Sequence, residues 1–271
     1  MVVNLNELIG AYNSELSEKI QNLKEFFIHN KKIALGFSGG VDSTFLLYAG
    51  LSFGADIRPY YVKSVFQPDF ELEDAVNTAN LLGTNIILLK ADVLSTPMVA
   101  ENPPNRCYFC KQGIFGMLKE KAASDGYTVI IDGTNASDDA SDRPGMVALK
   151  EFGVVSPLRE FGFCKSEIRQ ILKDAGIHIW YKPAYSCLAT RVATGEKITA
   201  ELLSKIEKAE EMLFSFGFCD FRVRVSQNRA RLQFVEGEID KANAMKDKII
   251  KAIKQNFDDV SENFEIRKSH G

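Results

Sequence analysis

The chain has 271 residues, a hydrophobic fraction of 45%, a charged fraction of 25% and a formal net charge of −3. These values are ordinary for a globular protein and argue against a disordered or fibrous chain. The negative charge argues against a nucleic acid as partner. No apolar run approaches the roughly 20 residues of a membrane span, and residues 1–12 do not resemble a signal peptide, so we expect a cytoplasmic protein without a membrane partner.

The first two thirds of the chain alternate predicted strands with predicted helices. An amphipathic helix over residues 5–30 comes first, and each later helix pattern ends at a glycine or shortly before one. This alternation is typical of a parallel sheet, so we expect an α/β fold with a doubly wound sheet. The strands are predicted over residues 31–37, 57–64, 85–89, 128–131 and 154–158, and the further helices over residues 43–53, 68–82 and 166–175.

The last third of the chain has a different pattern, which predicts a small α+β domain. We place the first domain over residues 1–185 and the small domain, with the loop that carries Cys187, over residues 186–271. Three segments lack periodicity, and such loops often lie over the ligand crevice of a doubly wound sheet. These segments are residues 93–106, 133–145 and 180–195, and the late elements are helices over residues 200–216 and 239–254 and strands over residues 221–225, 230–235 and 264–266.

Residues 38–43, with the sequence SGGVDS, join the first strand to the next helix. Glycines at the start of a helix let backbone N–H groups approach an anion closely, and the helix dipole favours negative charge there. The hydroxyl groups of Ser38 and Ser43 add further donors beside Gly39 and Gly40. The loop lacks the lysine of a kinase-type P-loop, which disfavours γ-phosphoryl transfer. An ordinary glycine turn with Asp42 as a helix N-terminal charge is the alternative interpretation.

This six-residue string resembles the pyrophosphate loop of the N-type ATP pyrophosphatases. The resemblance implies an adenine nucleotide alpha hydrolase-like fold and a reaction in which ATP activates a substrate oxygen and is split to AMP and pyrophosphate. It also implies that Ser38, Gly39, Gly40 and Ser43 bind ATP, and that Asp42 helps to hold Mg²⁺ or to position phosphate.

Three of the five cysteines stand in suggestive positions. Cys107 and Cys110 form a CxxC pair, and Cys187 lies in an irregular segment. The pair alone is compatible with half a zinc site, a redox pair or ordinary packing. Cys187 alone is compatible with an ordinary small residue in a turn. Three thiolates would suit a 4Fe-4S cluster that leaves one iron open to a ligand such as hydrosulfide.

Four strings together resemble the LarE family of sulfur transferases. They are NPPNRCYFC, which contains both cysteines of the pair, SDRPG near residue 143, SCLATRVATG, which begins at Ser186, and RVRV, which begins at Arg222. The resemblance implies that the protein activates a carboxylate of pyridinium-3,5-biscarboxylic acid mononucleotide and converts it to a thiocarboxylate, a step in making the nickel-pincer nucleotide. Cys187 would carry the sulfur.

The same resemblance assigns the remaining site residues. Arg222 and Arg224 would hold the phosphate and carboxylates of the substrate, with Asp142, Arg143 and Arg191 as further contacts. The simpler explanation for Arg222 and Arg224 is the alternation of side chains along a strand. The simpler explanation for the Asp-Arg-Pro-Gly segment is a surface turn. Arg191, like Arg106, is also a candidate neighbour that keeps sulfur anionic.

Two versions of the family chemistry exist. One consumes a single cysteine, and the other uses three cysteines to hold an iron–sulfur cluster. The CxxC pair favours the cluster version with Cys107, Cys110 and Cys187 as ligands, a sulfide donor as partner and, by analogy, a homo-oligomer. Cys164 and Cys219 are expected to pack in the structure. Alternative functions are a tRNA thiolase, an ammonia-dependent synthetase and a non-catalytic nucleotide and iron–sulfur sensor.

Overall fold

The computed structural model describes residues 2–138 and 143–267, which fall into two compact units. Two stretches from the first half of the sequence belong to the second unit. No helix in these described ranges is long and apolar enough to cross a bilayer. The first unit consists of Met1–Ser64, Asp69–Ala91 and Cys107–Lys182, and the second of Val65–Pro68, Asp92–Arg106 and Pro183–Gly271.

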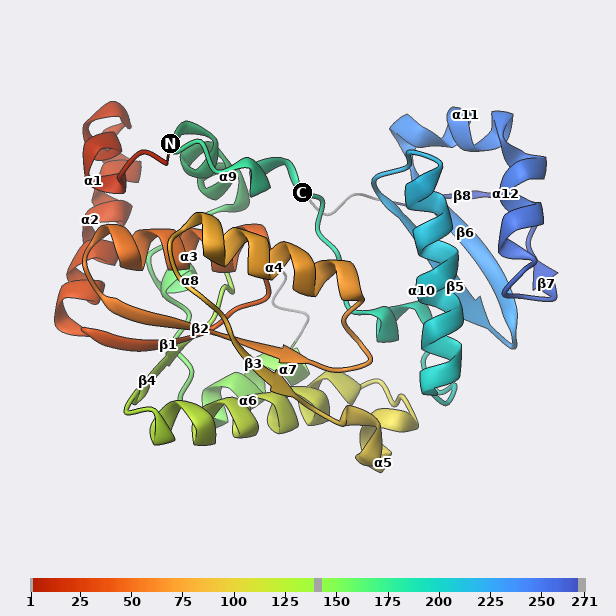
Figure 1. Cartoon of the computed structure of the whole chain (residues 1–271), viewed down its shortest axis with the longest axis horizontal. Coiled ribbons are helices and arrows are strands. Elements are labelled where there is room, and N and C mark those ends of the chain that lie inside the picture. The colour runs from red at the N-terminus through yellow and green to blue at the C-terminus, as the bar shows by residue number, and fades with distance from the viewer. Residues whose placement is uncertain (1, 139–142, 268–271) are drawn as a thin grey trace. The chain divides into compact units, whose positions relative to one another are not determined.

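The first unit contains a four-stranded parallel sheet with the strand order β3-β2-β1-β4 (Figure 1). The chain moves outward from β1 to β3 and then returns to place β4 on the other side of β1. The loops that follow β1 and β4 therefore begin at a topological switch point, where α/β sheets bind ligands. The strands are β1 Lys32–Gly36, β2 Asp56–Lys63, β3 Ile87–Lys90 and β4 Val129–Ile131.

Helices cover both faces of this sheet, which confirms the doubly wound arrangement (Figure 1). Strand β1 shows why, because Ile33 and Leu35 belong to one buried cluster and Ala34, between them, belongs to the other. The first cluster includes side chains from α2 Ser14–His29, α3 Val41–Ser52, α4 Asp69–Leu81 and α9 Lys165–Asp174, and the second includes side chains from α6 Arg106–Ser124.

In the first unit, two predicted elements differ from the structure. The strand predicted over residues 154–158 is wrong: Val155 makes only an isolated bridge to Ile131, and Pro157 then begins the short helix α8 Pro157–Glu160. Proline lacks an N–H for a strand ladder and suits the first turn of a helix. The helix predicted over residues 5–30 is interrupted, because α2 begins only after Asn13, whose side chain caps it. The segment before Asn13 consists of α1 Leu5–Leu8 and η1 Ile9–Ala11.

Several helical elements lie where we predicted no regular structure. The longest is α6, and α7 Arg143–Glu151 overlaps the predicted loop over residues 133–145. The apolar residues of α6 are not gathered on one face, which is why helical periodicity did not identify it. The short elements of these segments are η2 Val93–Ser95, α5 Pro97–Ala100, η3 His178–Tyr181 and η4 Leu188–Arg191.

The second unit is an α+β unit, as predicted. Strands β5 Phe221–Ser226 and β6 Arg229–Val235 pair antiparallel, and two short strands, β7 Asp259–Val260 and β8 Glu265–Arg267, pair parallel to β6. Helix α10 Ala200–Ser215 lies beside β5. The helix predicted over residues 239–254 is two helices that meet at Met245, namely α11 Glu236–Ala244 and α12 Lys246–Ile253.

Candidate active site

The loop of residues 38–43 is stabilised by its own serines. The Ser38 N–H donates to Ser43 Oγ at 3.3 Å, and the Gly40 N–H donates to Ser38 Oγ at 3.3 Å. Ser43 Oγ in turn donates to the Gly40 carbonyl at 3.3 Å. Gly40 is the N-cap of α3, which is long enough for its first turn to present N–H groups to an anion.

Two glycines allow other backbone segments to approach this loop closely. Gly39 has φ +70°, and a Cβ there would lie 2.7 Å from both Cα and Cβ of Ala75 in α4. Gly133, just after β4, has room for only a hydrogen, since a Cβ would lie 3.0 Å from the Ser43 nitrogen. Larger residues at these positions would move the loop, so the glycines determine where its N–H groups lie.

Asp42 carries the charge of the loop. One carboxylate oxygen forms an ion pair with Lys165 at the start of α9, whereas the other, Oδ1, is buried without a hydrogen-bond partner. Burial raises the pKa of Asp42 and the nearby carboxylate of Asp138 adds to this rise, while Lys165 and the neighbouring side chain of Asn135 oppose it. A buried oxygen without a donor is the expected condition of a ligand for a hard cation, so Asp42 fits a Mg²⁺ site.

The end of β4 adds a buried carboxylate to the switch point. Asp132 is 8% exposed and accepts hydrogen bonds from Thr134 Oγ1 and Ser156 Oγ, both at 2.6 Å. Asp132 directly precedes Gly133, whose close approach to the Ser43 nitrogen places this turn beside the phosphate loop. Its hydrogen bonds hold the segment that follows β4 in place.

The CxxC pair lies on the first turn of α6. Cys107 and Cys110 are three residues apart on this helix, so both side chains occupy one face, and both are partly exposed. Cys187 belongs to the second unit. Within the described residues, no group of three or more His, Cys, Asp or Glu side chains could hold a metal ion. The pair alone offers two thiolates, which is fewer than a cluster requires.

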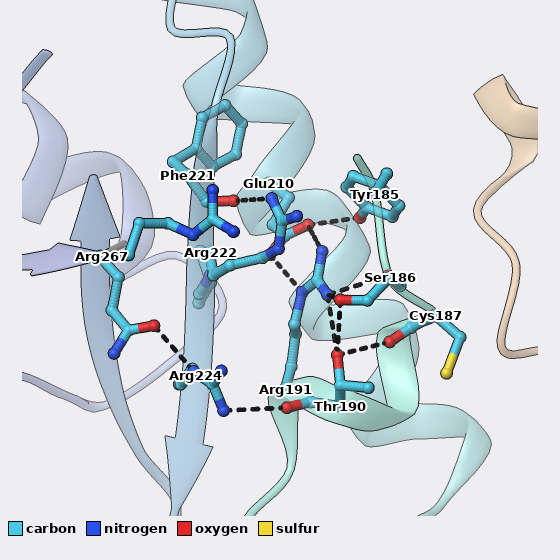
Figure 2. A network of polar contacts seen from close by, with 12 residues as sticks. Tyr185, Ser186, Cys187, Thr190, Arg191, Glu210, Phe221, Arg222, Arg224 and Arg267 are labelled. Atoms are coloured by element: carbon cyan, nitrogen blue, oxygen red, sulfur yellow. Dashed lines mark hydrogen bonds and ion pairs between the residues drawn. The ribbon is translucent and has the colours of Figure 1, made fainter. Parts of the chain in front are cut away.

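Cys187 is the N-cap of the single turn η4 in the second unit. Arg191, at the end of this turn, is 1% exposed and forms a two-fold ion pair with Glu210 of α10, with Nε to Oε1 at 2.9 Å and Nη2 to Oε2 at 3.1 Å. Figure 2 shows that the Cys187 sulfur points away from this network. Burial lowers the pKa of Arg191, whereas the nearby carboxylate of Glu210 raises it. The net result is a pKa above the usual value.

Further guanidinium groups surround this pair. Arg222 of β5 is buried and donates to the carbonyl of Ala184, and its pKa is lowered to about 10 by burial and by the charges of Arg191 and Arg267 (Figure 2). Arg224 is exposed and donates to Gln233 Oε1 at 2.7 Å. We call Arg191, Arg222, Arg224 and Arg267 the arginine cluster. Its four cations face three carboxylates, Glu210, Asp220 and Glu265, so it has an excess of positive charge.

Comparison with known proteins identifies the family. Over 227 residues the chain is 37% identical to an uncharacterized protein of Synechocystis sp., covering 83% of this chain and 84% of that protein. Over 211 residues it is 31% identical to the pyridinium-3,5-bisthiocarboxylic acid mononucleotide synthase of Lactiplantibacillus plantarum, covering 77% and 76%. This chain belongs to the LarE family. No family model matches the LarE-family chain.

A more distant similarity relates this LarE-family chain to the wider PP-loop superfamily. It is 25% identical over 191 residues to the tRNA-specific 2-thiouridylase MnmA of Thermotoga maritima, covering 55% of this chain and 53% of that protein. The parallel sheet with its glycine loop after β1 agrees with this superfamily.

The structure distributes the predicted site residues of the LarE-family chain over both units. The five residues of the phosphate loop lie together in the first unit, and Arg191, Arg222 and Arg224 lie together with Cys187 in the second. Asp142 and the side chain of Arg143 lie outside the described residues. Arg191 donates to Glu210 and Ser186, and its role toward a substrate stays a prediction.

Two charged residues of the LarE-family chain could not be assigned to the site from the sequence motifs. Lys165 lies 123 residues after Asp42, and no local pattern connects the two. Glu210 had a signal: it interrupts the apolar stripe of α10 formed by Leu203, Ile206 and Leu213. An acidic residue on the buried face of an amphipathic helix predicts a buried cationic partner.

Proposed function

We propose that the protein is an ATP-dependent sulfurtransferase that adenylylates a carboxylate of pyridinium-3,5-biscarboxylic acid mononucleotide and converts it to a thiocarboxylate. The observation that carries this proposal is the glycine loop at the N-terminus of α3, with the partnerless buried oxygen of Asp42 beside it. The name of the Lactiplantibacillus plantarum relative supports the choice of substrate, because that name gives the bisthiocarboxylic product.

In the first step, a carboxylate oxygen of the substrate attacks the α-phosphorus of ATP, and the bond to the β-phosphate breaks to release pyrophosphate. The backbone N–H groups at Gly39 and Gly40 would hold the departing phosphates, because the loop has no lysine of its own. Asp42 would hold Mg²⁺, which neutralises charge on the phosphates when it is bound. Adenylylation makes the carboxylate oxygen a good leaving group.

In the second step, an anionic sulfur attacks the acyl carbon, and AMP leaves with the former carboxylate oxygen. Attack by hydrosulfide gives the thiocarboxylate after loss of its proton. Attack by the Cys187 thiolate gives a thioester, from which the thiocarboxylate is released when loss of the Cα proton of Cys187 breaks its Cβ–S bond and leaves dehydroalanine. Cys187 is the proposed sulfur-bearing residue, since it is partly exposed and its sulfur points away from the hydrogen-bond network of its loop (Figure 2). The excess positive charge of the arginine cluster would favour an anionic substrate in this unit.

A 4Fe-4S cluster on Cys107, Cys110 and Cys187 stays a proposal. The first two thiols share one face of α6, which suits two ligands of one cluster. A bound cluster would supply a site for the sulfide that is transferred.

Replacement of Cys187 by serine is expected to separate the two steps. The variant should still release one pyrophosphate per active site when ATP and the acid substrate are mixed, but it should form no thiocarboxylate, because serine cannot supply sulfur. If the cluster is present in anaerobically reconstituted protein, the same variant should also retain less iron. Rapid-quench assays of pyrophosphate, mass spectrometry of the product and an iron assay provide the three measurements.

The matched control is Cys219→Ser. The expectation that Cys219 packs in the structure is wrong, because this cysteine is exposed, and its replacement should leave sulfur transfer at the normal rate. Formation of thiocarboxylate by Cys187→Ser at the normal rate would refute the sulfur-bearing role of Cys187. Absence of pyrophosphate release from the unaltered protein, with either acid or tRNA present, would favour a nucleotide sensor.

A further inference from the structure

The side chain of Thr190 contacts the main chain of Cys187. The Cys187 carbonyl accepts hydrogen bonds from both the backbone N–H of Thr190, at 2.9 Å, and its Oγ1, at 2.8 Å. The turn η4 between them is only four residues long. Short 3₁₀ turns have poor hydrogen-bond geometry, so such a turn depends on side-chain contacts for a defined position.

Thr190 is connected to the buried ion pair behind it. Arg191 Nη1 donates to Thr190 Oγ1 at 2.9 Å, and the same nitrogen lies 2.9 Å from the Ser186 carbonyl and 2.8 Å from Ser186 Oγ (Figure 2). The other two nitrogens of this guanidinium group donate to Glu210. One arginine therefore contacts residues on both sides of Cys187.

Glu210 joins this loop to the regular structure of the second unit. Its Oε1 accepts the backbone N–H of Val223 in β5 at 2.8 Å, and its Oε2 accepts the hydroxyl of Tyr185. Both oxygens of the carboxylate thus have donors besides Arg191. A continuous set of hydrogen bonds leads from strand β5 through Glu210, Arg191 and Thr190 to the carbonyl of Cys187 (Figure 2).

The following residues of the loop are held by other parts of the second unit. The Leu188 N–H donates to the Phe66 carbonyl at 2.8 Å, and the Ala189 carbonyl accepts from Arg106. Every one of these contacts involves the main chain or a neighbour of Cys187, while its sulfur points away from the network (Figure 2). The arrangement defines the position of the Cys187 backbone, from which its side chain projects.

We propose that Thr190, supported by the Arg191–Glu210 pair, is a positioning residue that sets where the Cys187 sulfur is presented to the activated acyl carbon. This inference rests on the proposed function, in which the sulfur must reach that carbon. Reacting atoms must approach to about 3–3.5 Å, and a displacement of about 1 Å can slow a reaction about 100-fold. A rotation of the single turn η4 is enough to produce such a displacement.

The test compares Thr190→Val with Thr190→Ser. Valine keeps the shape of threonine but removes the hydroxyl, whereas serine keeps the hydroxyl and serves as the rescue variant. For valine we expect a 10- to 100-fold slower formation of thiocarboxylate, an unchanged rate of pyrophosphate release in a single turnover and an unchanged KM for ATP. Serine should restore sulfur transfer. Backbone amides over residues 185–191 should exchange about five- to ten-fold faster in the valine variant only.

The assay of thiocarboxylate formation and the hydrogen-exchange measurement together distinguish the failure of this inference from the failure of the proposed function. Sulfur transfer at the normal rate in Thr190→Val, or a loss that serine does not restore, would overturn the positioning role. If the unaltered protein forms no thiocarboxylate at all, the proposed function fails. In that case hydrogen exchange still decides whether Thr190 holds the loop, and unchanged exchange in the valine variant refutes it.

Discussion

Glu210→Ala is expected to lower the free energy of unfolding by about 3–5 kcal/mol, the usual cost of removing one partner from a buried ion pair. Arg191 is 1% exposed and would remain charged in the interior without its carboxylate. The backbone N–H of Val223 and the hydroxyl of Tyr185 would also lose their acceptor. Urea unfolding followed by circular dichroism measures the change.

Glu201→Ala is the matched control, since Glu201 lies on the same helix and its ion pair with Lys205 is exposed. This variant should unfold at nearly the same urea concentration as the unaltered protein, because solvent screens an exposed pair. Equal midpoints for Glu210→Ala and Glu201→Ala would show that the buried network contributes little to stability.

Gly39→Ala is expected to slow pyrophosphate release about 100-fold, because the phosphate loop must shift to admit a methyl group. The added Cβ would lie 2.7 Å from the Cα of Ala75, a backbone atom that cannot move without moving α4. The substitution should also destabilise the protein by more than the roughly 1–2 kcal/mol that a left-handed backbone costs a residue with a Cβ. Single-turnover assays and urea unfolding report the two effects separately.

Gly54→Ala separates the cost of a left-handed backbone from the effect of the clash with Ala75. Gly54 follows the other end of α3 with φ +76°, and a Cβ there would meet no neighbouring side chain or backbone atom within 4 Å. This variant should show the backbone cost alone and release pyrophosphate at the normal rate. Normal release by Gly39→Ala as well would mean that the position of the loop does not matter for ATP cleavage.

The features that were predictable from the sequence are those with a local cause. The parallel strands show as apolar runs, and the glycine loop shows as a string of six consecutive residues. The strand predicted over residues 154–158 is wrong for a reason that is also visible in the sequence. Pro157 favours the start of a helix, and this preference outweighs the strand preference of the apolar residues around it. Helix α6 was missed because its apolar residues do not share one face.

The contacts that complete the candidate site are non-local, and this is why they were not predictable. Lys165 meets Asp42 only because α9 and α3 pack on the same face of the sheet. Likewise, Phe66 and Arg106 belong to the second unit although they lie far before its main segment, Pro183–Gly271, in the sequence. Each forms a hydrogen bond with the segment after Cys187. A one-dimensional pattern cannot give such pairings without the topology.

The path of one oxygen atom tests the proposed chemistry most directly. If the carboxylates of the substrate are labelled with heavy oxygen, activation through an acyl adenylate must transfer one labelled atom to AMP for each thiocarboxylate formed. Mass spectrometry of AMP, pyrophosphate and product after a single turnover follows the label. We predict label in AMP and none in pyrophosphate. Unlabelled AMP alongside thiocarboxylate, or release of ADP and phosphate, would contradict the account.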